Sequence, residues 1–180
     1  YMALWPDNRV YSAAVTKLVE SARPKMKENS DLITLGWREW ARLPDLGIDA
    51  IKVKVDTGAR TSAIHAFELE TFTEDGKERV EFRIHPLQRD DATIVTCVAD
   101  VVDQRVVTDS GGHKEERIVI STTLDIGKYS WPIEATLTAR DNMLFRMLLG
   151  RTAIKGRAHV NPARSYLIGK KSGLKRHSRS

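Results

Sequence analysis

The chain has 180 residues and a net charge of +5, and its 41% hydrophobic and 29% charged residues are ordinary for a globular protein. It contains no apolar run near the roughly 20 residues that a membrane-spanning helix needs, which excludes an integral membrane protein. The single cysteine excludes a disulfide within the chain, and residues 1–7 lack a signal-peptide pattern. We therefore expect a cytoplasmic protein. The alternative of a signal peptide that was removed before residue 1 stays open.

The first predicted element is a helix over residues 12–22. Ser12 stands where a helix-capping residue is favoured, and Pro24 follows the end of the helix. The residues at helical spacing are Ala14, Val15, Leu18, Val19 and Ala22. Residues 25–31 form a polar linker, so we interpret residues 1–32 as a helical extension outside the main domain.

From residue 33 onward the pattern changes to short segments typical of β-strands, separated by turn residues. The pair Asp75-Gly76 between two alternating segments is a strong hairpin signal. The predicted strands cover residues 32–37, 51–55, 66–72, 79–84, 93–102, 104–108, 116–122 and 131–138. So many short strands with little helix between them favour a mainly β fold, and we expect a closed β-barrel over residues 33–168.

The last segment, residues 169–180, is predicted to be a flexible basic tail. It holds five cations and no acid, which leaves 24 Lys and Arg against 24 Asp and Glu in the rest of the chain; the five are Lys170, Lys171, Lys175, Arg176 and Arg179. Because the tail has no aromatic ring, we expect it to contact nucleic acid only weakly, by salt-sensitive charge attraction.

The segment Asp56-Thr57-Gly58-Ala59 is the most informative for chemistry, because an acid follows a predicted strand directly and sits in a turn. An Asp-Thr-Gly sequence alone is often only a turn. Its weight comes from a second segment far along the chain, Leu148-Leu149-Gly150-Arg151. Two large apolar residues and a glycine of this kind pack beneath the catalytic loop in an aspartic-protease lobe, where the glycine permits a close crossing of two backbones.

Four ordered motifs together resemble the bacterial retropepsin-like aspartic proteases, which are often labelled ATP-dependent zinc proteases. The motifs are LGWREW at residues 35–40, LPDLGI at 43–48, KVDTGARTS at 54–62 and MLLGRT at 147–152, and the resemblance covers residues 33–168. It implies a single-lobe acid-protease barrel. It also implies an association with ATP-grasp ligases that add glutamate to a ribosomal protein.

Peptide hydrolysis by carboxylates needs two such groups, one to activate water and one to protonate the carbonyl oxygen. Two close carboxylates share one proton and titrate together, as they do in aspartic proteases. By the resemblance, Asp56 is half of this dyad, Thr57 ties two loops together, Gly58 leaves room for the substrate backbone and Ala59 fills the small position after it. One such motif in the chain implies a homodimeric endopeptidase, with both Asp56 side chains on the two-fold axis and a protein or peptide as substrate.

A second acid-hydroxyl-glycine triplet, Asp109-Ser110-Gly111, leaves an alternative open, a dyad of Asp56 and Asp109 within one chain. The spacing is short for a second lobe, and no second apolar-apolar-glycine segment accompanies it. We expect instead the tip of a hairpin flap over the substrate, formed by Thr108, Asp109, Ser110, Gly111 and Gly112. An ordinary exposed hairpin turn is the remaining interpretation.

Other chemistries find little support, and we expect no metal and no cofactor. The histidines match no zinc motif and no GxxxxGK[ST] phosphate loop exists; the histidines are His65, His85, His113, His159 and His177. Cys97 lies in an apolar predicted strand and is interpreted as a core residue rather than the nucleophile of a thiol protease. Arg60 beside the turn is weak evidence for acidic substrates, and Arg151 is a candidate for an ion pair at the dimer interface or for a surface position.

A function of a different class also stays open. The chain is then a catalytically silent binding module that keeps the barrel and regulates the glutamate ligase, or binds the ligase's substrate or the ribosome. The basic tail and the N-terminal helix motivate this alternative.

Overall fold

The computed structural model describes residues 32–108, 111–112, 114–139 and 144–169. The predicted helix at residues 12–22 and the basic tail from residue 170 lie outside the described residues and stay predictions. Within the described residues, no helix is long and apolar enough to cross a membrane.

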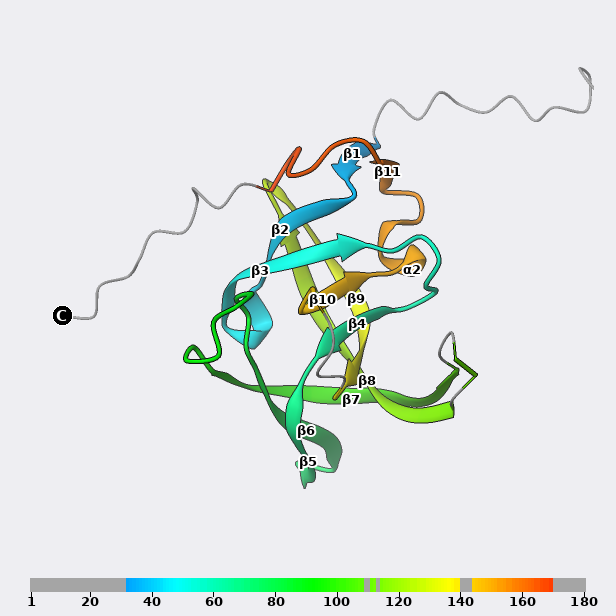
Figure 1. The fold of residues 1–180 in the computed structure, drawn as a ribbon. Coiled ribbons are helices and arrows are strands. Elements are labelled where there is room, and N and C mark those ends of the chain that lie inside the picture. The colour runs from blue at the N-terminus through cyan, green and yellow to red at the C-terminus, as the bar shows by residue number, and fades with distance from the viewer. Residues whose placement is uncertain (1–31, 109–110, 113, 140–143, 170–180) are drawn as a thin grey trace, which may run out of the picture. The chain divides into compact units, whose positions relative to one another are not determined.

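The described residues form mainly β structure, as predicted (Figure 1). The strands are β1 (Ile33–Gly36), β2 (Arg38–Leu43), β3 (Ile48–Val55), β4 (Ser62–His65), β5 (Phe67–Glu74), β6 (Lys77–Ile84), β7 (Val95–Thr108), β8 (Lys114–Ile126), β9 (Tyr129–Thr138), β10 (Met147–Leu149) and β11 (Ala158–Asn161). A short 3-10 helix, η1 (Pro44–Leu46), and one helical turn, α2 (Arg151–Ile154), complete the list. Strand β7 is continuous where the sequence predicted two strands, whereas β1 and β2 are separate strands where the pattern marked only the first.

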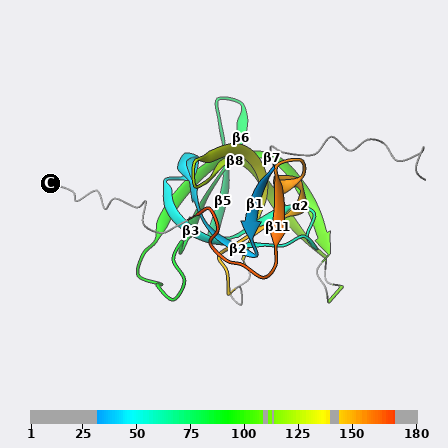
Figure 2. The ribbon, with the colours of Figure 1, turned by 90° about the horizontal axis from the view of Figure 1, so that it is seen from above.

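Nine strands form one sheet in the order β2-β3-β10-β4-β9-β8-β7-β6-β5, and β1 pairs with β11 in parallel. A further pairing places Arg42 on β2 opposite Asp125 on β8, so the first strand of the order meets the sixth. The ribbon accordingly curls around a shared interior when it is viewed from the side and from above (Figures 1 and 2).

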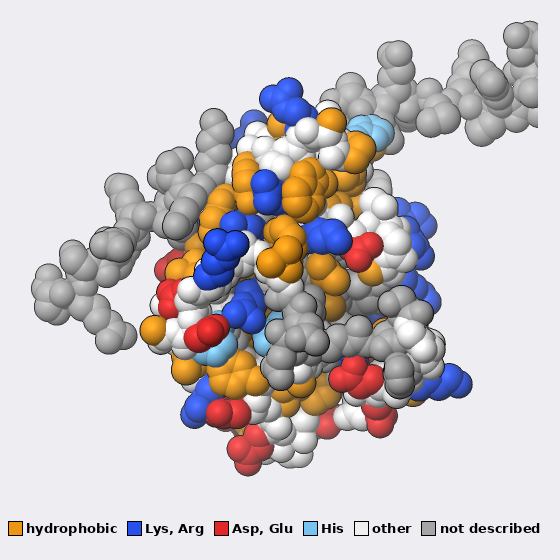
Figure 3. Space-filling model, in the orientation of Figure 1, with side chains coloured by type: hydrophobic (Ala, Val, Ile, Leu, Met, Phe, Trp, Pro, Cys, Tyr) orange, Lys and Arg blue, Asp and Glu red, His pale blue; other side chains and the backbone are white. Residues whose placement is uncertain are grey.

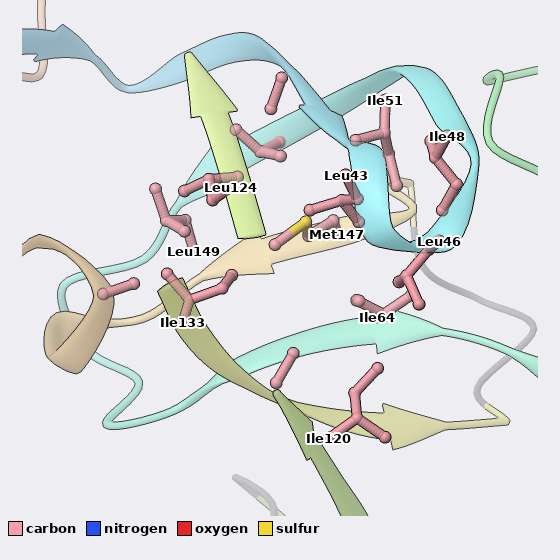
Figure 4. Close-up of a cluster of buried hydrophobic side chains, with 14 of the residues drawn as sticks. Leu43, Leu46, Ile48, Ile51, Ile64, Ile120, Leu124, Ile133, Met147 and Leu149 are labelled. Carbon is pink, nitrogen blue, oxygen red and sulfur yellow. The ribbon is translucent and has the colours of Figure 1, made fainter. Parts of the chain in front are cut away.

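The interior is filled by aliphatic side chains from the strands of this curl (Figure 4). Strand β3 shows how the sequence achieves this, because Val53 and Val55 point inward while Lys52 and Lys54 alternate on the other face. Side chains with no exposed surface include Leu43, Ile51, Ile64, Leu124 and Met147. Burying each of these contributes about 1.5–3 kcal/mol, so the core dominates the stability of the fold.

One buried side chain in β2 is charged. Alternation along β2 turns Glu39 inward with Ala41 and Leu43, and Glu39 has no exposed surface. Its Oε1 accepts the N–H groups of Gly36 at 2.7 Å and Leu167 at 2.9 Å, and its Oε2 accepts those of Ile168 at 3.3 Å and Gly169 at 3.0 Å. Four backbone donors thus satisfy one buried carboxylate, and the segment before the tail is held against β2.

We expect the substitution Glu39→Gln to lower the free energy of unfolding by roughly 2–5 kcal/mol. The amide keeps one acceptor oxygen, but its NH₂ group meets two backbone donors that are then left buried without an acceptor. Urea unfolding followed by circular dichroism measures the change, with Glu81→Gln on the exposed face of β6 as the matched control. A loss for Glu39→Gln within about 0.5 kcal/mol of the control, the usual range for surface substitutions, contradicts this account of the carboxylate.

Candidate active site

Asp56 follows β3 directly and opens the loop that leads to β4. Its carboxylate Oδ1 accepts the backbone N–H of Gly58 at 3.0 Å and that of Ala59 at 3.2 Å, and the side chain is half-buried. Its own N–H donates to the carbonyl oxygen of Leu149 at 2.9 Å. The loop therefore fixes the carboxylate in one orientation with two N–H groups turned toward the same oxygen.

Strand β10 brings the second predicted segment against this loop. Leu149 lies opposite Val55 in a parallel pairing with β3, and Leu148 lies opposite Ala63 in an antiparallel pairing with β4. Gly150 then crosses the end of the loop so closely that a Cβ there would lie 2.5 Å from the carbonyl carbon of Thr61. The two motifs that the sequence singled out are in contact, and the glycine is required by the crossing.

Hydrogen bonds from the start of α2 secure the other side of the loop. Nη1 of Arg151 donates to the carbonyl oxygens of Thr57 and Gly58, both at 2.9 Å, and its backbone N–H donates to Ala59 at 2.9 Å. Within one chain, Arg151 thus binds carbonyl groups of the loop, and the predicted ion pair across a dimer stays a prediction. The exposed Thr57 and Gly58 face away from the core.

Two hydroxyl residues support the crossing and were not singled out from the sequence. The Oγ of the buried Ser62 accepts the N–H of Gly150 at 3.1 Å, and Thr152 donates its Oγ1 hydrogen to the carbonyl oxygen of Arg60 at 3.0 Å. Ser62 ends the motif KVDTGARTS and Thr152 ends the motif MLLGRT, but the sequence assigned neither residue a role. The sequence signal that could have identified them is a small hydroxyl side chain close to a predicted backbone crossing.

The predicted flap lies at the end of the β7–β8 hairpin, where Val107 pairs with Glu115 and Thr108 with Lys114. Asp109 and Ser110 lie outside the described residues, so a dyad with Asp109 stays untested. Gly111 and Gly112 are exposed, and Gly112 has a φ of +84°, which glycine adopts without strain. The end of this hairpin and the loop after β3 lie on the same side of the molecule in both views (Figures 1 and 2).

A hollow of about 690 Å³ adjoins the loop. Thr57 and Arg60 line it from the loop, Arg151 and Lys155 from α2 and its end, and His159 from β11. Three of the nine residues that line the hollow, Arg60, Arg151 and Lys155, are cationic and none is acidic, so the hollow favours an anionic group beside Asp56.

Other candidate groups are placed elsewhere. Among the residues that the structure describes, no three His, Cys, Asp or Glu side chains gather as they would around a metal. His85 stacks on Phe67 with ring centroids 4.7 Å apart. Cys97 is buried on β7, its Sγ lies 3.4 Å from the carbonyl oxygen of Leu46, and burial raises the pKa of this thiol to about 12.

Comparison with known proteins gives this geometry a context. Residues 34–171 match the family described as "Retropepsin-like aspartic endopeptidase RimB". A crystal structure of the Legionella pneumophila protein Lpg0085, described as of unknown function, superposes with a TM-score of 0.65. The match covers 76% of this chain and 98% of that one at 23% identity, so the fold is shared.

Three curated relatives are each named "Probable alpha-L-glutamate ligase". The chain is 48% identical to the Desulfotalea psychrophila protein over 77% of its own length, 42% identical to the Shewanella pealeana protein over 83%, and 46% identical to the Parasynechococcus marenigrum protein over 76%. It spans only 30%, 32% and 29% of the lengths of these relatives.

We expect Gly150→Ala to destabilise the fold by roughly 1–3 kcal/mol or more, because the added methyl group overlaps the backbone of Thr61 and Ser62. Gly58→Ala is the matched control, since a Cβ there meets only Oδ1 of Asp56, at 3.1 Å. Thermal unfolding of the two variants measures the difference. Equal melting temperatures in the two variants contradict a steric need for glycine at the crossing.

We expect the thiol of Cys97 to resist alkylation in the folded protein and to react quickly after unfolding. The reactive form is the thiolate, and the raised pKa keeps the folded thiol protonated at neutral pH. The pKa of the thiol is about 12 in the folded protein, against a reference value of 9.0. The contribution of the protonated thiol to the free energy of unfolding is therefore fully present below pH 9 and is lost as the pH rises from 9 to 12. Iodoacetamide labelling with and without urea measures reactivity, and fast labelling of the native protein would revive the thiol-protease reading.

Proposed function

This chain belongs to the RimB family of retropepsin-like aspartic endopeptidases, and from that premise we propose that it hydrolyses peptide bonds with a dyad of Asp56 from two copies. The observation that carries the proposal is the fixed carboxylate of Asp56, with its two N–H donors and with Leu149 and Gly150 beneath the loop. A carboxylate oriented by hydrogen bonds before substrate arrives is what acid–base catalysis requires.

The second carboxylate comes from a second copy. We interpret the curled sheet, in which β2 meets β8, as the closed barrel of one acid-protease lobe. An isologous dimer brings the same residue of both copies to the two-fold axis, and Thr57, which is exposed, would tie the two loops together. Gly58 leaves room for the substrate backbone, and the β7–β8 hairpin closes over it as a flap.

In the proposed reaction, a water molecule lies between the two Asp56 carboxyl groups, which share one proton. The ionised carboxylate removes a proton from the water, and the water oxygen attacks the carbonyl carbon of the scissile bond. The protonated partner gives its proton to the carbonyl oxygen. When the resulting tetrahedral species collapses, the C–N bond breaks and the amine nitrogen takes the proton that the first carboxyl group had removed from water. One hydroxyl of the tetrahedral species gives its proton to the second carboxylate, so the pair again shares one proton.

The substrate is a protein or peptide, and we propose that acidic side chains flank the scissile bond. The hollow beside Thr57 supports this, since Arg60, Arg151 and Lys155 line it. Attraction between these cations and a carboxylate speeds encounter and orients the peptide. Arg60, which the sequence offered as weak evidence alone, thus has cationic neighbours in space.

We propose that the catalytic domain spans residues 33–168 and acts in the cytoplasm without metal or cofactor. The predicted extension at 1–32 and the predicted basic tail at 169–180 lie outside it. A second candidate function is favoured by the relatives named as glutamate ligases, of which the chain spans about a third. In this alternative the domain is catalytically silent and regulates such a ligase or binds the ligase's substrate.

We expect Asp56→Asn to lower peptide cleavage by roughly 10²–10⁴-fold, because the amide can neither accept the proton from water nor return one. Cleavage of a glutamate-containing peptide library, followed by mass spectrometry, measures the effect. Asp49→Asn is the matched control, because it removes an exposed carboxylate from β3, the strand that leads to Asp56. Unchanged cleavage by Asp56→Asn rejects the proposal.

Mixed dimers separate the shared dyad from a dyad within one chain. Two differently tagged chains, one wild-type and one Asp56→Asn, are purified as a mixed dimer. We expect this mixed dimer to be as inactive as a dimer in which both chains carry Asp56→Asn. Half of the wild-type activity, or full activity in a protein that sediments as a monomer, favours the dyad of Asp56 and Asp109. An inactive wild-type protein that alters the rate of a glutamate ligase favours the regulatory module.

A further inference from the structure

The outer face of β2 and β3 carries cations and rings in register. Arg38 lies opposite Lys54, and Trp40 lies opposite Lys52, so all four side chains share the surface that faces away from the core. The half-buried rings of Trp37 and Tyr166 join them. We call Trp37, Arg38, Trp40, Lys52 and Tyr166 the cation–ring face.

The cations of this face are held in place by the rings. The guanidinium of Arg38 lies 4.4 Å from the ring centroid of Trp37 and 5.1 Å from that of Tyr166, and its Nε donates to Oγ of Ser165 at 3.2 Å. The ammonium of Lys52 lies 5.1 Å from the ring of Trp40, which stacks on Tyr166 with centroids 6.4 Å apart. Cations that are ordered in advance lose less conformational entropy when an anion binds.

A hollow of about 560 Å³ extends this face and has the same charge. Arg38, Lys52, Arg89 and Arg146 line it together with one acid, Asp91, which pairs with Arg146 at 3.0 Å. Lys and Arg side chains lie among hydrophobic ones over the face of the molecule seen in Figure 3. Residues 142–169 contain five cations and no acid, and one of these cations, Arg146, lines this hollow.

We propose that the cation–ring face binds single-stranded nucleic acid. Its cations suit phosphate groups, and its half-buried rings suit bases that stack on them or on the guanidinium plane of Arg38. The rings favour nucleic acid over an acidic peptide as the ligand. A peptide of Asp and Glu has negative charge but no aromatic group that could stack on the rings. The proposal thus adds a nucleic-acid contact on the folded domain to the weak contact expected of the tail.

Fluorescence anisotropy of labelled oligo(U) and oligo(dT) 12-mers, titrated with the full chain, tests the proposal. We expect the double variant Arg38→Ser/Lys52→Ser to bind at least tenfold more weakly than wild type. Each phosphate contact contributes about 0.7 to the slope of log K against log salt, so we expect a slope shallower by roughly 1.4. The control Lys77→Ser/Lys128→Ser removes the same charge from the exposed start of β6 and from the exposed turn between β8 and β9, and it should bind as wild type does.

A ring variant separates stacking from charge. We expect Trp40→Leu to weaken binding about tenfold, within the range for loss of one stacked base, without a change in the salt slope. Thermal unfolding checks each variant, and if Arg38→Ser unfolds, Lys52→Ser/Arg89→Ser takes its place. Binding of oligo(U) alone, oligo(dT) alone or both supports the proposal, since all three use phosphates and bases.

Two results overturn the proposal. One is binding of the double variant that equals that of the control. The other is a labelled oligoglutamate peptide that binds the cation–ring face more tightly than either oligonucleotide. Asp56→Asn should bind the oligonucleotides as wild type does, so a failure of the proposed peptidase activity and a failure of this inference remain distinguishable.

Discussion

The close crossing of two backbones at Gly150 is the constraint on which the site depends. Thr61 and Gly150 approach within a distance that excludes any side chain, and the approach lets the N–H of Asp56 reach the carbonyl of Leu149. Strand β10 can therefore pair with β3 and β4 at once, which brings the ends of both strands beneath one loop. The orientation of the Asp56 carboxylate follows from this crossing, because the loop that holds it has little freedom left.

A second constraint acts where β2 meets the end of the described chain. Burying an ionised carboxylate is costly unless hydrogen bonds compensate, and Glu39 is compensated by four backbone N–H groups. Two more glycines lie at close backbone approaches in this region. A Cβ on Gly36 would overlap the backbone of Arg164, and a Cβ on Gly169 would overlap the backbone of Trp40. Close backbone approaches thus occur both at the Asp56 loop and where β2 meets residues 164–169, and a buried charge accompanies the second.

Periodicity predicted much of the fold, and the misses have physical causes. Alternation at residues 51–55 gave both faces of β3, and Asp75-Gly76 gave the turn between β5 and β6. Strand β4 was missed because Ser62–His65 is buried throughout and has no alternation to detect. Glu39 was missed as a buried residue because hydrophobic patterning treats an acid as exposed, although the alternation of Ala41 and Leu43 in β2 puts it inside.

The residues of the candidate site were identifiable from the sequence, whereas their contacts were less so. Asp56 and Gly150 were identifiable because an acid in a turn and a glycine after two apolar residues each imply a special backbone. The role of Arg151 was not, because an exposed arginine has many equivalent partners until the loop carbonyls are placed. Strand β3 then explains why the two proposed anion-binding regions adjoin. One face of it packs the core, the other carries Lys52 and Lys54, and its end presents Asp56, so a bound polyanion and a peptide under hydrolysis would lie along one strand.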